Sequence, residues 1–215
     1  MMNVVVIGGG TAGWLSALFL NRRMNDIGVT LIESKSIGVI GVGEGTTPNI
    51  VPFLKKLGID ETDFITKTKA TKKIGISFEG WQGNDSLFNH DFHQNSNSSY
   101  AYHFDNNKIL NYFKNLGISR NINHIEGDVI GFDKTGDDIN TIHLKDGTSI
   151  QTDFIIDCSG FKRLVIGSEL VGEWISHKDQ LTLNSAIPFR LPLTDSEEYT
   201  IDSKTRTRAI SMKNG

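Results

Sequence analysis

The stretch Gly8-Gly9-Gly10-Thr11-Ala12-Gly13-Trp14, which directly follows the apolar run Val4-Val5-Val6-Ile7, decides the fold of this chain. The β-branched run predicts a short strand, and the helical spacing of Leu15, Leu18 and Arg22 predicts a helix after the glycines. A strand, a glycine-rich turn and a helix in this order present bare backbone N–H groups to a pyrophosphate. The chain therefore begins with the pattern of a dinucleotide-binding unit.

A second strand is expected at Val29-Thr30-Leu31-Ile32, and it ends on Glu33, twenty residues after Gly13. An acid at this point accepts hydrogen bonds from both hydroxyls of an adenosine ribose, and it disfavours a 2′-phosphate. Gly8 is expected to allow the tight turn, and Gly10 to let the backbone approach the phosphates. Gly13 is expected to let helix and strand pack closely.

The composition indicates a globular protein with a core of its own. The 215 residues are 38% hydrophobic, and the net charge of −3 gives no long-range attraction to nucleic acid or an anionic membrane. The single cysteine, Cys158, excludes an internal disulfide and is typical of a reducing compartment. The apolar N-terminal run is too short for a membrane span. We therefore expect a cytoplasmic protein, and no metal site, since His90 and His93 have no third ligand nearby in the sequence.

The second half of the chain favours flavin over nicotinamide. Residues 124–152 alternate apolar and polar positions around glycine turns, which predicts an antiparallel β-meander. A buried strand is expected next, Phe154-Ile155-Ile156-Asp157, followed by Cys158-Ser159-Gly160. This order resembles FAD-dependent monooxygenases and reductases. The expected fold is therefore α/β, with a Rossmann-type FAD-binding core of three layers.

Four further segments narrow the resemblance. They are Ile40-Gly41-Val42-Gly43-Glu44-Gly45-Thr46-Thr47-Pro48, Lys73-Ile74-Gly75-Ile76-Ser77-Phe78-Glu79-Gly80-Trp81, Tyr102-His103-Phe104-Asp105 and Asp157-Cys158-Ser159-Gly160-Phe161. Together with the opening glycine turn, they resemble the flavin-dependent tryptophan halogenases in amino-acid sequence and in their order along the chain. The resemblance extends over nearly the whole chain.

Membership of that family implies halogenation of tryptophan or a related electron-rich aromatic. It implies FAD, used as FADH2 from a separate flavin reductase, together with O2 and chloride or bromide. It also implies that Lys73 is the catalytic residue, which activates hypohalous acid, and that His90 and Phe92 contact the substrate ring. The residues expected to bind the cofactor are Gly8, Gly9, Gly10, Ala12, Gly13, Glu33, Ser34, Ile37, Ile40, Val42, Gly45 and Val129.

The local pattern around Lys73 is compatible with a buried lysine. A strand over 73–81 places Ile74, Ile76 and Phe78 on one face and Lys73 on the other. Burial lowers the pKa of a lysine and so favours a neutral amine. The alternative is that Lys67, Lys69, Lys72 and Lys73 form one solvated cluster at a helix end, where cations suit the helix dipole. Within the family interpretation, Lys72 is the neighbouring candidate for the catalytic lysine.

The expected organisation is an FAD-binding region over residues 1–160, with an insert over 60–100 that carries the lysine. Residues 161–215 are expected to begin an incomplete substrate-binding region. The sequence ends where the Trp-x-Trp-x-Ile-Pro motif of the family is expected to begin, so we expect a truncated or split halogenase. Two alternatives remain, a flavin-dependent aromatic monooxygenase and a non-catalytic FAD-binding fragment.

Overall fold

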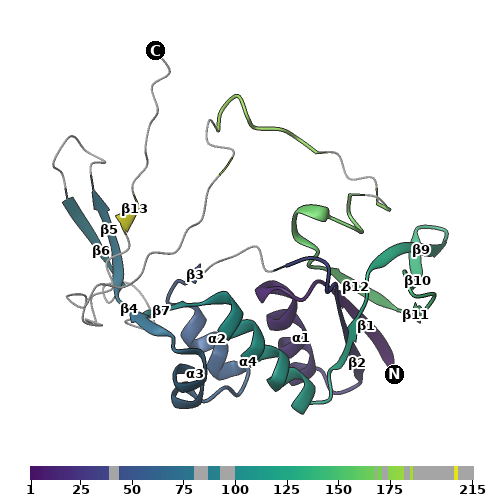
Figure 1. Ribbon diagram of the computed structural model, residues 1–215, viewed down its shortest axis with the longest axis horizontal. Coiled ribbons are helices and arrows are strands. Elements are labelled where there is room, and N and C mark those ends of the chain that lie inside the picture. The colour runs from purple at the N-terminus through teal and green to yellow at the C-terminus, as the bar shows by residue number, and fades with distance from the viewer. Residues whose placement is uncertain are drawn as a thin grey trace. The chain divides into compact units, whose positions relative to one another are not determined.

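The computed structural model describes residues 1–38, 44–79, 87–92, 100–167, 169–170, 174–181, 185 and 206–207 (Figure 1). These residues belong to two compact units. The first comprises described residues from 1–42 and 106–189, and the second comprises described residues from 43–105 and 190–215. The functional division expected at residue 160 stays a prediction.

A parallel sheet of four strands forms the centre of the first unit. Its strands are β1 (Met2–Ile7), β2 (Ile27–Glu33), β8 (Asn123–Glu126) and β12 (Phe154–Asp157), in the order β12-β1-β2-β8. All three pairings are parallel. Parallel pairing brings the carboxyl ends of β1 and β2 to the same edge, which is where ligands bind in open α/β sheets.

Helices cover one face of this sheet and a second, antiparallel sheet covers the other (Figure 1). The helices are α1 (Thr11–Arg23) and α4 (Asn106–Ser119), which pack against each other. The antiparallel sheet comprises β9 (Val129–Thr135), β10 (Asp138–Leu144) and β11 (Ser149–Gln151). The unit therefore has the three layers that the sequence predicts.

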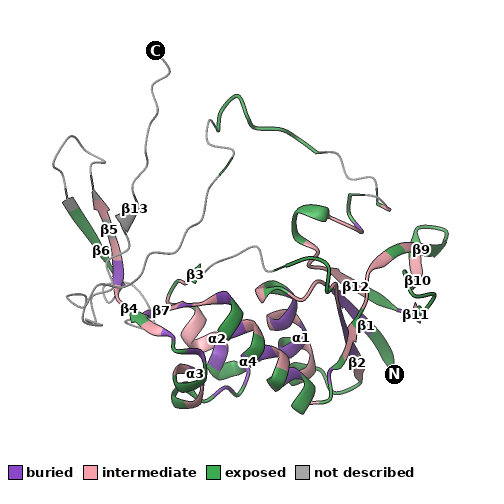
Figure 2. Cartoon of the chain, viewed as in Figure 1, coloured by how far each residue is buried: buried purple, intermediate pink, exposed green. Residues whose placement is uncertain are grey.

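The alternation of side chains along β1 explains how one strand supports both layers. Val5 and Ile7 pack against Ile142 and Leu144 of β10 in one buried cluster. Because successive side chains of a strand point to opposite faces, Val4 and Val6 lie on the helix side. All four of these β1 residues are buried, as the purple end of this strand shows (Figure 2).

Two predictions for this sheet were wrong. Residues 124–126 do not belong to the meander, because they lie in β8, which pairs in parallel with β2, and the meander begins only at Val129. The strand β12 is not buried, because it lies at the edge of the sheet and Phe154 is 58% exposed. The periodicity of a strand does not reveal which neighbour it pairs with, or whether it is an edge strand.

The contact between α1 and α4 depends on Gly117, and this gives a testable prediction. A Cβ on Gly117 would lie 2.5 Å from the ring of the buried Trp14. We expect Gly117→Ala to lower the free energy of unfolding by about 1–3 kcal/mol through overpacking. Thermal unfolding measures this effect, and Asn115→Ala, at an exposed position of the same helix, should leave the melting temperature unchanged. An unchanged melting temperature for Gly117→Ala would contradict the close packing of α1 on α4.

The second unit contains two short helices and two small sheets. The helices are α2 (Ile50–Lys56) and α3 (Glu61–Thr68). One sheet has the order β3-β7-β4, from β3 (Glu44–Gly45), β7 (Ala101–Phe104) and β4 (Thr71–Lys73). The other has the order β13-β5-β6, from β13 (Arg206–Thr207), β5 (Gly75–Glu79) and β6 (Leu87–Asp91).

The single strand expected over 73–81 is instead two strands that belong to different sheets. Strand β4 ends at Lys73 and pairs with β7, whereas β5 begins at Gly75 and pairs with β6. The chain changes sheets at Ile74, whose carbonyl accepts a hydrogen bond from the backbone N–H of Phe92. The alternation expected between Lys73 and the following residues therefore does not apply.

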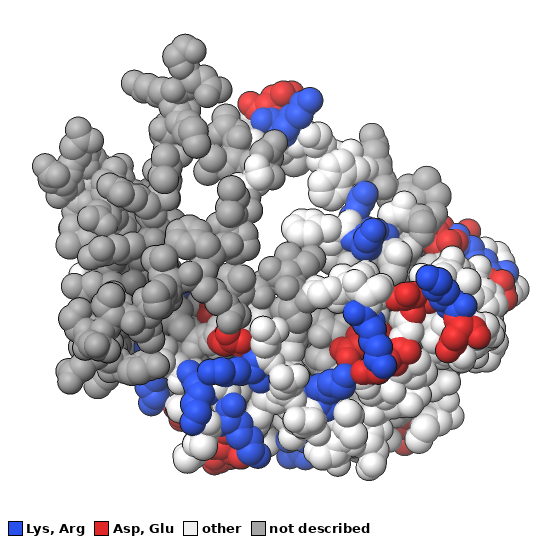
Figure 3. Space-filling model, viewed as in Figure 1, with Lys and Arg blue, Asp and Glu red and all other residues white. Residues whose placement is uncertain are grey.

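The surface of the described residues carries both signs of charge. Lys and Arg side chains are interspersed with Asp and Glu on the face shown in Figure 3. Within the described part of the chain, no helix has both the length and the apolar character needed to cross a membrane.

Candidate functional site

The glycine turn between β1 and α1 needs glycine at both ends. Gly8 has a φ of 119°, and its N–H donates to the carbonyl of Ile32 on β2. A Cβ on Gly8 would lie 2.2 Å from the carbonyl oxygen of Cys158, and one on Gly13 would lie 1.8 Å from that of Gly8. The tight turn and the close packing expected from the sequence are both present.

Gly10 has a different environment from the other glycines of the turn. It is the N-cap residue of α1, it is exposed, and no atom of the described residues lies within 4 Å of a Cβ built on it. The first turn of α1 contains no acidic side chain, and Gly10 has no side chain to cap the helix. Because the first N–H groups of a helix lack intrahelical partners, this open end fits a pyrophosphate.

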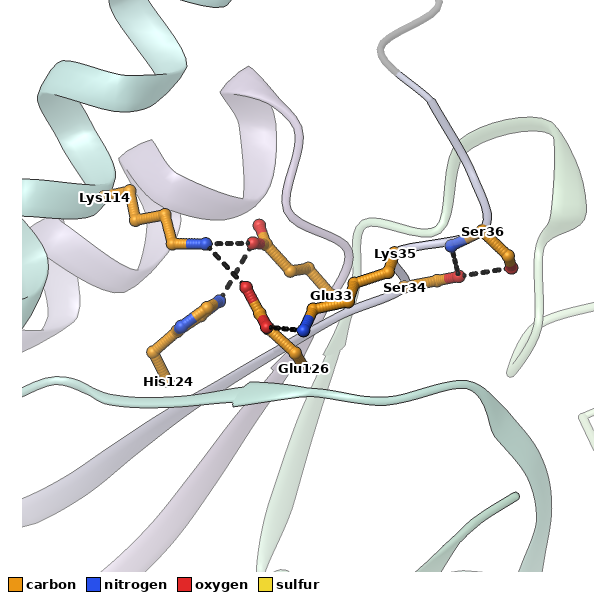
Figure 4. Close-up of polar contacts among 7 residues, drawn as sticks. All are labelled: Glu33, Ser34, Lys35, Ser36, Lys114, His124 and Glu126. Atoms are coloured by element: carbon orange, nitrogen blue, oxygen red, sulfur yellow. Dashed lines mark hydrogen bonds and ion pairs between the residues drawn. The ribbon is translucent and has the colours of Figure 1, made fainter. Parts of the chain in front are cut away.

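Glu33 lies beside the turn at the end of β2. A Cβ on Gly9 would lie 2.0 Å from Oε2 of Glu33, so this carboxylate oxygen borders the glycines directly. The other oxygen, Oε1, accepts a 2.7 Å hydrogen bond from Lys114 Nζ on α4 and lies 3.0 Å from Nε2 of His124 on β8 (Figure 4). The acid that the sequence predicts as the ribose acceptor therefore belongs to a charged network.

Two lysines balance the second acid of this network, Glu126. Hydrogen bonds from Lys35 and then from Lys114 lower the pKa of Glu126 to about 2. Glu33, His124 and Glu126 present potential metal-ligating atoms within 4.8 Å of one another. Lys114 Nζ contacts both carboxylates, at 2.7 and 3.0 Å, and so supplies the positive charge that a metal ion would otherwise provide.

The other expected cofactor-binding residues have varied environments. The Ser34 hydroxyl donates to Asp128, whereas Ile37 is 52% exposed and Ala12 is exposed. Val129, the first residue of β9, is partly buried and packs against the core cluster between the two sheets. Gly45 lies in β3 of the second unit. The remaining two, Ile40 and Val42, lie outside the described residues.

Lys73 is buried in the second unit, with a relative exposure of 5%. Its Nζ donates a 3.3 Å hydrogen bond to the carbonyl of Thr46 and lies 5.5 Å from the centre of the Phe92 ring. Burial lowers the pKa of this lysine. The buried lysine compatible with the sequence is therefore present, and the solvated alternative is wrong at this position.

Lys72 lies on the opposite face of β4. It pairs in register with Tyr102, whereas Lys73 pairs with Ala101. The Lys72 ammonium is 3.3 Å from Glu61, and this carboxylate also accepts a hydrogen bond of 2.9 Å from the Tyr102 hydroxyl. Strand alternation thus separates an exposed, ion-paired lysine from a buried one.

A pocket of about 480 Å³ lies next to Lys73. Its lining carries charges of both signs and is formed by Glu44, Gly45, Lys69, Thr71, Lys73, His103, Phe104 and Asp105. A Cβ on Gly45 would lie 3.0 Å from the His103 ring and 3.3 Å from Lys73 Nζ. Burial, and then the charge of Lys73, lower the pKa of His103, so a neutral imidazole is favoured beside the lysine.

The two residues expected to contact substrate lie close together. His90 is exposed on β6, Phe92 follows that strand and is buried, and their rings meet edge to face with centroids 6.4 Å apart. His93 and Trp81 lie outside the described residues. Because Phe92 contacts His90 on one side and lies 5.5 Å from the Lys73 amine, it links His90 to the lysine.

Sequence reasoning missed the partners that these site residues use. Lys114, His124 and Glu126 surround Glu33, and His103 and Glu44 line the pocket at Lys73. Glu44 and His103 occur within two of the family segments, which is a usable signal. Lys114 had no such signal, because a lysine on the polar side of an amphipathic helix is usually solvated.

The family model described as tryptophan halogenase matches residues 3–99 and 93–215. Among curated proteins, the tryptophan 6-halogenase ThaL of Streptomyces albogriseolus is 25% identical, over 99% of this chain and 52% of its own length. The tryptophan 7-halogenase RebH of Lentzea aerocolonigenes is 24% identical, with the same two coverages. The chain thus spans about half the length of these curated relatives.

Solved structures give the same result for the fold. A flavin-dependent halogenase from Xanthomonas campestris superimposes with a TM-score of 0.73 and 31% identity, over 79% of this chain and 44% of its own. The tryptophan 6-halogenase SttH from Streptomyces toxytricini gives a TM-score of 0.79 at 24% identity, over 84% of this chain and 48% of its own.

Proposed function

Because the chain belongs to the tryptophan halogenase family, we propose that it carries the flavin site and the catalytic lysine of a halogenating enzyme. The proposed reaction is the flavin-dependent halogenation of tryptophan or a related electron-rich aromatic. One observation carries this proposal: the Lys73 amine is buried beside a pocket and next to the aromatic ring of Phe92.

The proposed cofactor is FAD, held at its adenosine diphosphate end by the first unit. The open N-terminus of α1 at Gly10 fits the pyrophosphate, and Glu33 beside Gly9 fits the ribose hydroxyls. Bound in its reduced form, this cofactor would supply two electrons to O2, and the partly reduced oxygen would then oxidise halide to hypohalous acid. The parts proposed for Ser34, Ile37, Ile40, Val42, Gly45 and Val129 rest on the family resemblance.

Lys73 is proposed to activate the hypohalous acid. As an ammonium it would donate a hydrogen bond to the oxygen and polarise the oxygen–halogen bond. As a neutral amine it would attack the halogen, so that a nitrogen–halogen bond forms, hydroxide leaves, and an N–H proton converts hydroxide to water. The lowered pKa of Lys73 favours the second route.

The proposed partners follow from this chemistry. A separate flavin reductase would supply FADH2, and O2 with chloride or bromide would complete the reactants. His90 and Phe92 are proposed to contact the flat face of the substrate ring, because Phe92 lies near Lys73 and His90 lies beside Phe92. We also propose the cytoplasm as the location, since the reductase draws on its nicotinamide pool.

The purified chain tests this function directly. It is incubated with FAD, a flavin reductase, NADH, air and tryptophan, with chloride, with bromide or without halide, and the products are identified by mass spectrometry. We expect a halogenated product only when halide is present. A hydroxylated product formed without halide would instead identify an aromatic monooxygenase, and FAD binding without any product would show that these 215 residues do not halogenate by themselves.

A further inference from the structure

Lys114 connects two acids that come from neighbouring strands. Its Nζ lies 2.7 Å from Glu33 Oε1 and 3.0 Å from Glu126 Oε1, and the lysine reaches both from helix α4 (Figure 4). Burial would lower its pKa, but the hydrogen bonds and charges of the two acids outweigh burial and raise it. Lys114 is therefore charged at neutral pH, and its charge offsets the repulsion between the two carboxylates.

The two oxygens of Glu33 consequently face different partners. Oε1 accepts from Lys114 and lies 3.0 Å from the buried Nε2 of His124. Oε2 borders Gly9. A carboxylate anchored through one oxygen cannot rotate freely, so its second oxygen keeps a fixed direction beside the glycine turn.

We propose that Lys114 is a positioning residue for the cofactor: by holding Oε1 of Glu33, it presents Oε2 to the hydroxyls of the adenosine ribose. This inference rests on the proposed flavin site and adds a residue that does not itself touch the ligand. Without the ammonium, Glu126 would keep its ion pair with Lys35, whereas Glu33 would lose its anchor and adopt several rotamers. Fixing Glu33 in one rotamer when the nucleotide binds would then cost conformational entropy and reduce the affinity for the nucleotide.

A comparison of two nucleotides isolates the contribution of the ribose hydroxyls to binding. ADP and 2′,3′-dideoxy-ADP share the base and the phosphates, and titration calorimetry measures the Kd of each. In the wild-type chain we expect ADP to bind at least tenfold more tightly, because hydrogen bonds to a charged acceptor are strong. Lys114→Met should weaken ADP binding by about tenfold and leave the binding of the dideoxy nucleotide unchanged. Lys114→Arg should restore ADP binding.

A double-mutant cycle separates positioning from a structural role. In the background of Glu33→Gln, Lys114→Met should have no further effect on the Kd of ADP, because the residue that it positions is already altered. Lys108→Met, at an exposed position of the same helix, is the matched control and should behave as wild type. The melting temperature of each variant shows that it is folded.

The outcomes distinguish the two levels of the proposal. If wild type prefers ADP and Lys114→Met keeps the same preference, the positioning role is wrong and the flavin site stands. If Lys114→Met weakens both nucleotides equally, its role is structural and the inference is overturned. If neither ADP nor FAD binds to the wild-type chain, the flavin site itself is wrong and the inference is lost with it.

Discussion

Gly10→Val is expected to abolish FAD binding while leaving the fold intact. Among the residues that the structure describes, a Cβ at Gly10 meets no atom within 4 Å, and the backbone there has an extended conformation that valine adopts readily. The added side chain would therefore begin in open space and occupy the position proposed for the pyrophosphate. We expect the Kd for FAD, measured by flavin fluorescence, to rise by at least about 100-fold. Because valine is a poorer N-cap residue than glycine, we expect the melting temperature to fall by no more than about 4 °C.

Gly131→Val provides the matched control for this substitution. Gly131 lies on β9, and a Cβ there likewise meets no atom of the described part of the chain within 4 Å. The same side chain is thus added in open space away from the glycine turn, and FAD binding should stay at the wild-type level. Normal flavin uptake by Gly10→Val would contradict the assignment of this turn to the cofactor. Equal loss of binding in both variants would indicate a general effect of valine.

Lys73→Met is expected to abolish halogenation and to stabilise the protein. Methionine fills a similar volume but carries no charge, so the variant removes the desolvation cost of a buried ammonium. In the tryptophan assay we expect product formation to fall by at least about 100-fold, the scale of losing a group that handles protons or halogen in the reaction. The Kd for FAD should be unchanged. The melting temperature at pH 7 should rise by about 2–4 °C for each kcal/mol by which the free energy of unfolding increases.

The pH dependence of this stabilisation has a definite sign. The pKa of Lys73 is lower in the folded chain than its ordinary value of 10.5, so the unfolded chain binds more protons between the two pKa values. Wild-type stability therefore rises with pH in that window, while the methionine variant lacks this contribution. The difference in free energy of unfolding between variant and wild type should be largest below the folded pKa and should shrink towards pH 10.5.

Lys72→Met is the control for Lys73→Met. Lys72 is the adjacent residue, but its ammonium is partly exposed and paired with Glu61. Its removal should leave halogenation intact and should not raise the melting temperature. Retained halogenation in Lys73→Met, or its loss in Lys72→Met instead, would show that the catalytic lysine is assigned wrongly.

The sequence predicted the local elements of the first unit well. The strand–turn–helix at Gly8 and the second strand that ends on Glu33 were confirmed, and so was the meander from Val129 onward. These features depend on short-range rules: apolar periodicity, glycine backbone freedom and turn residues. The pairing of β8 with β2 and the change of sheets at Ile74 were not predicted, because the choice of strand partners depends on contacts distant in the sequence.

By itself, the sequence determined the residue types at the site. It identified glycines where a side chain would clash, an acid at the end of β2, and a lysine in a segment that resembles one family. Only the tertiary structure decided the environment of these groups. Pairing of β4 with β7 buries Lys73 and leaves Lys72 paired with Glu61. Helix α4 brings Lys114 to Glu33 from 81 positions along the chain. Burial and charge pairing depend on tertiary contacts between segments that are distant in the sequence, and these contacts determine the pKa and the orientation of each group.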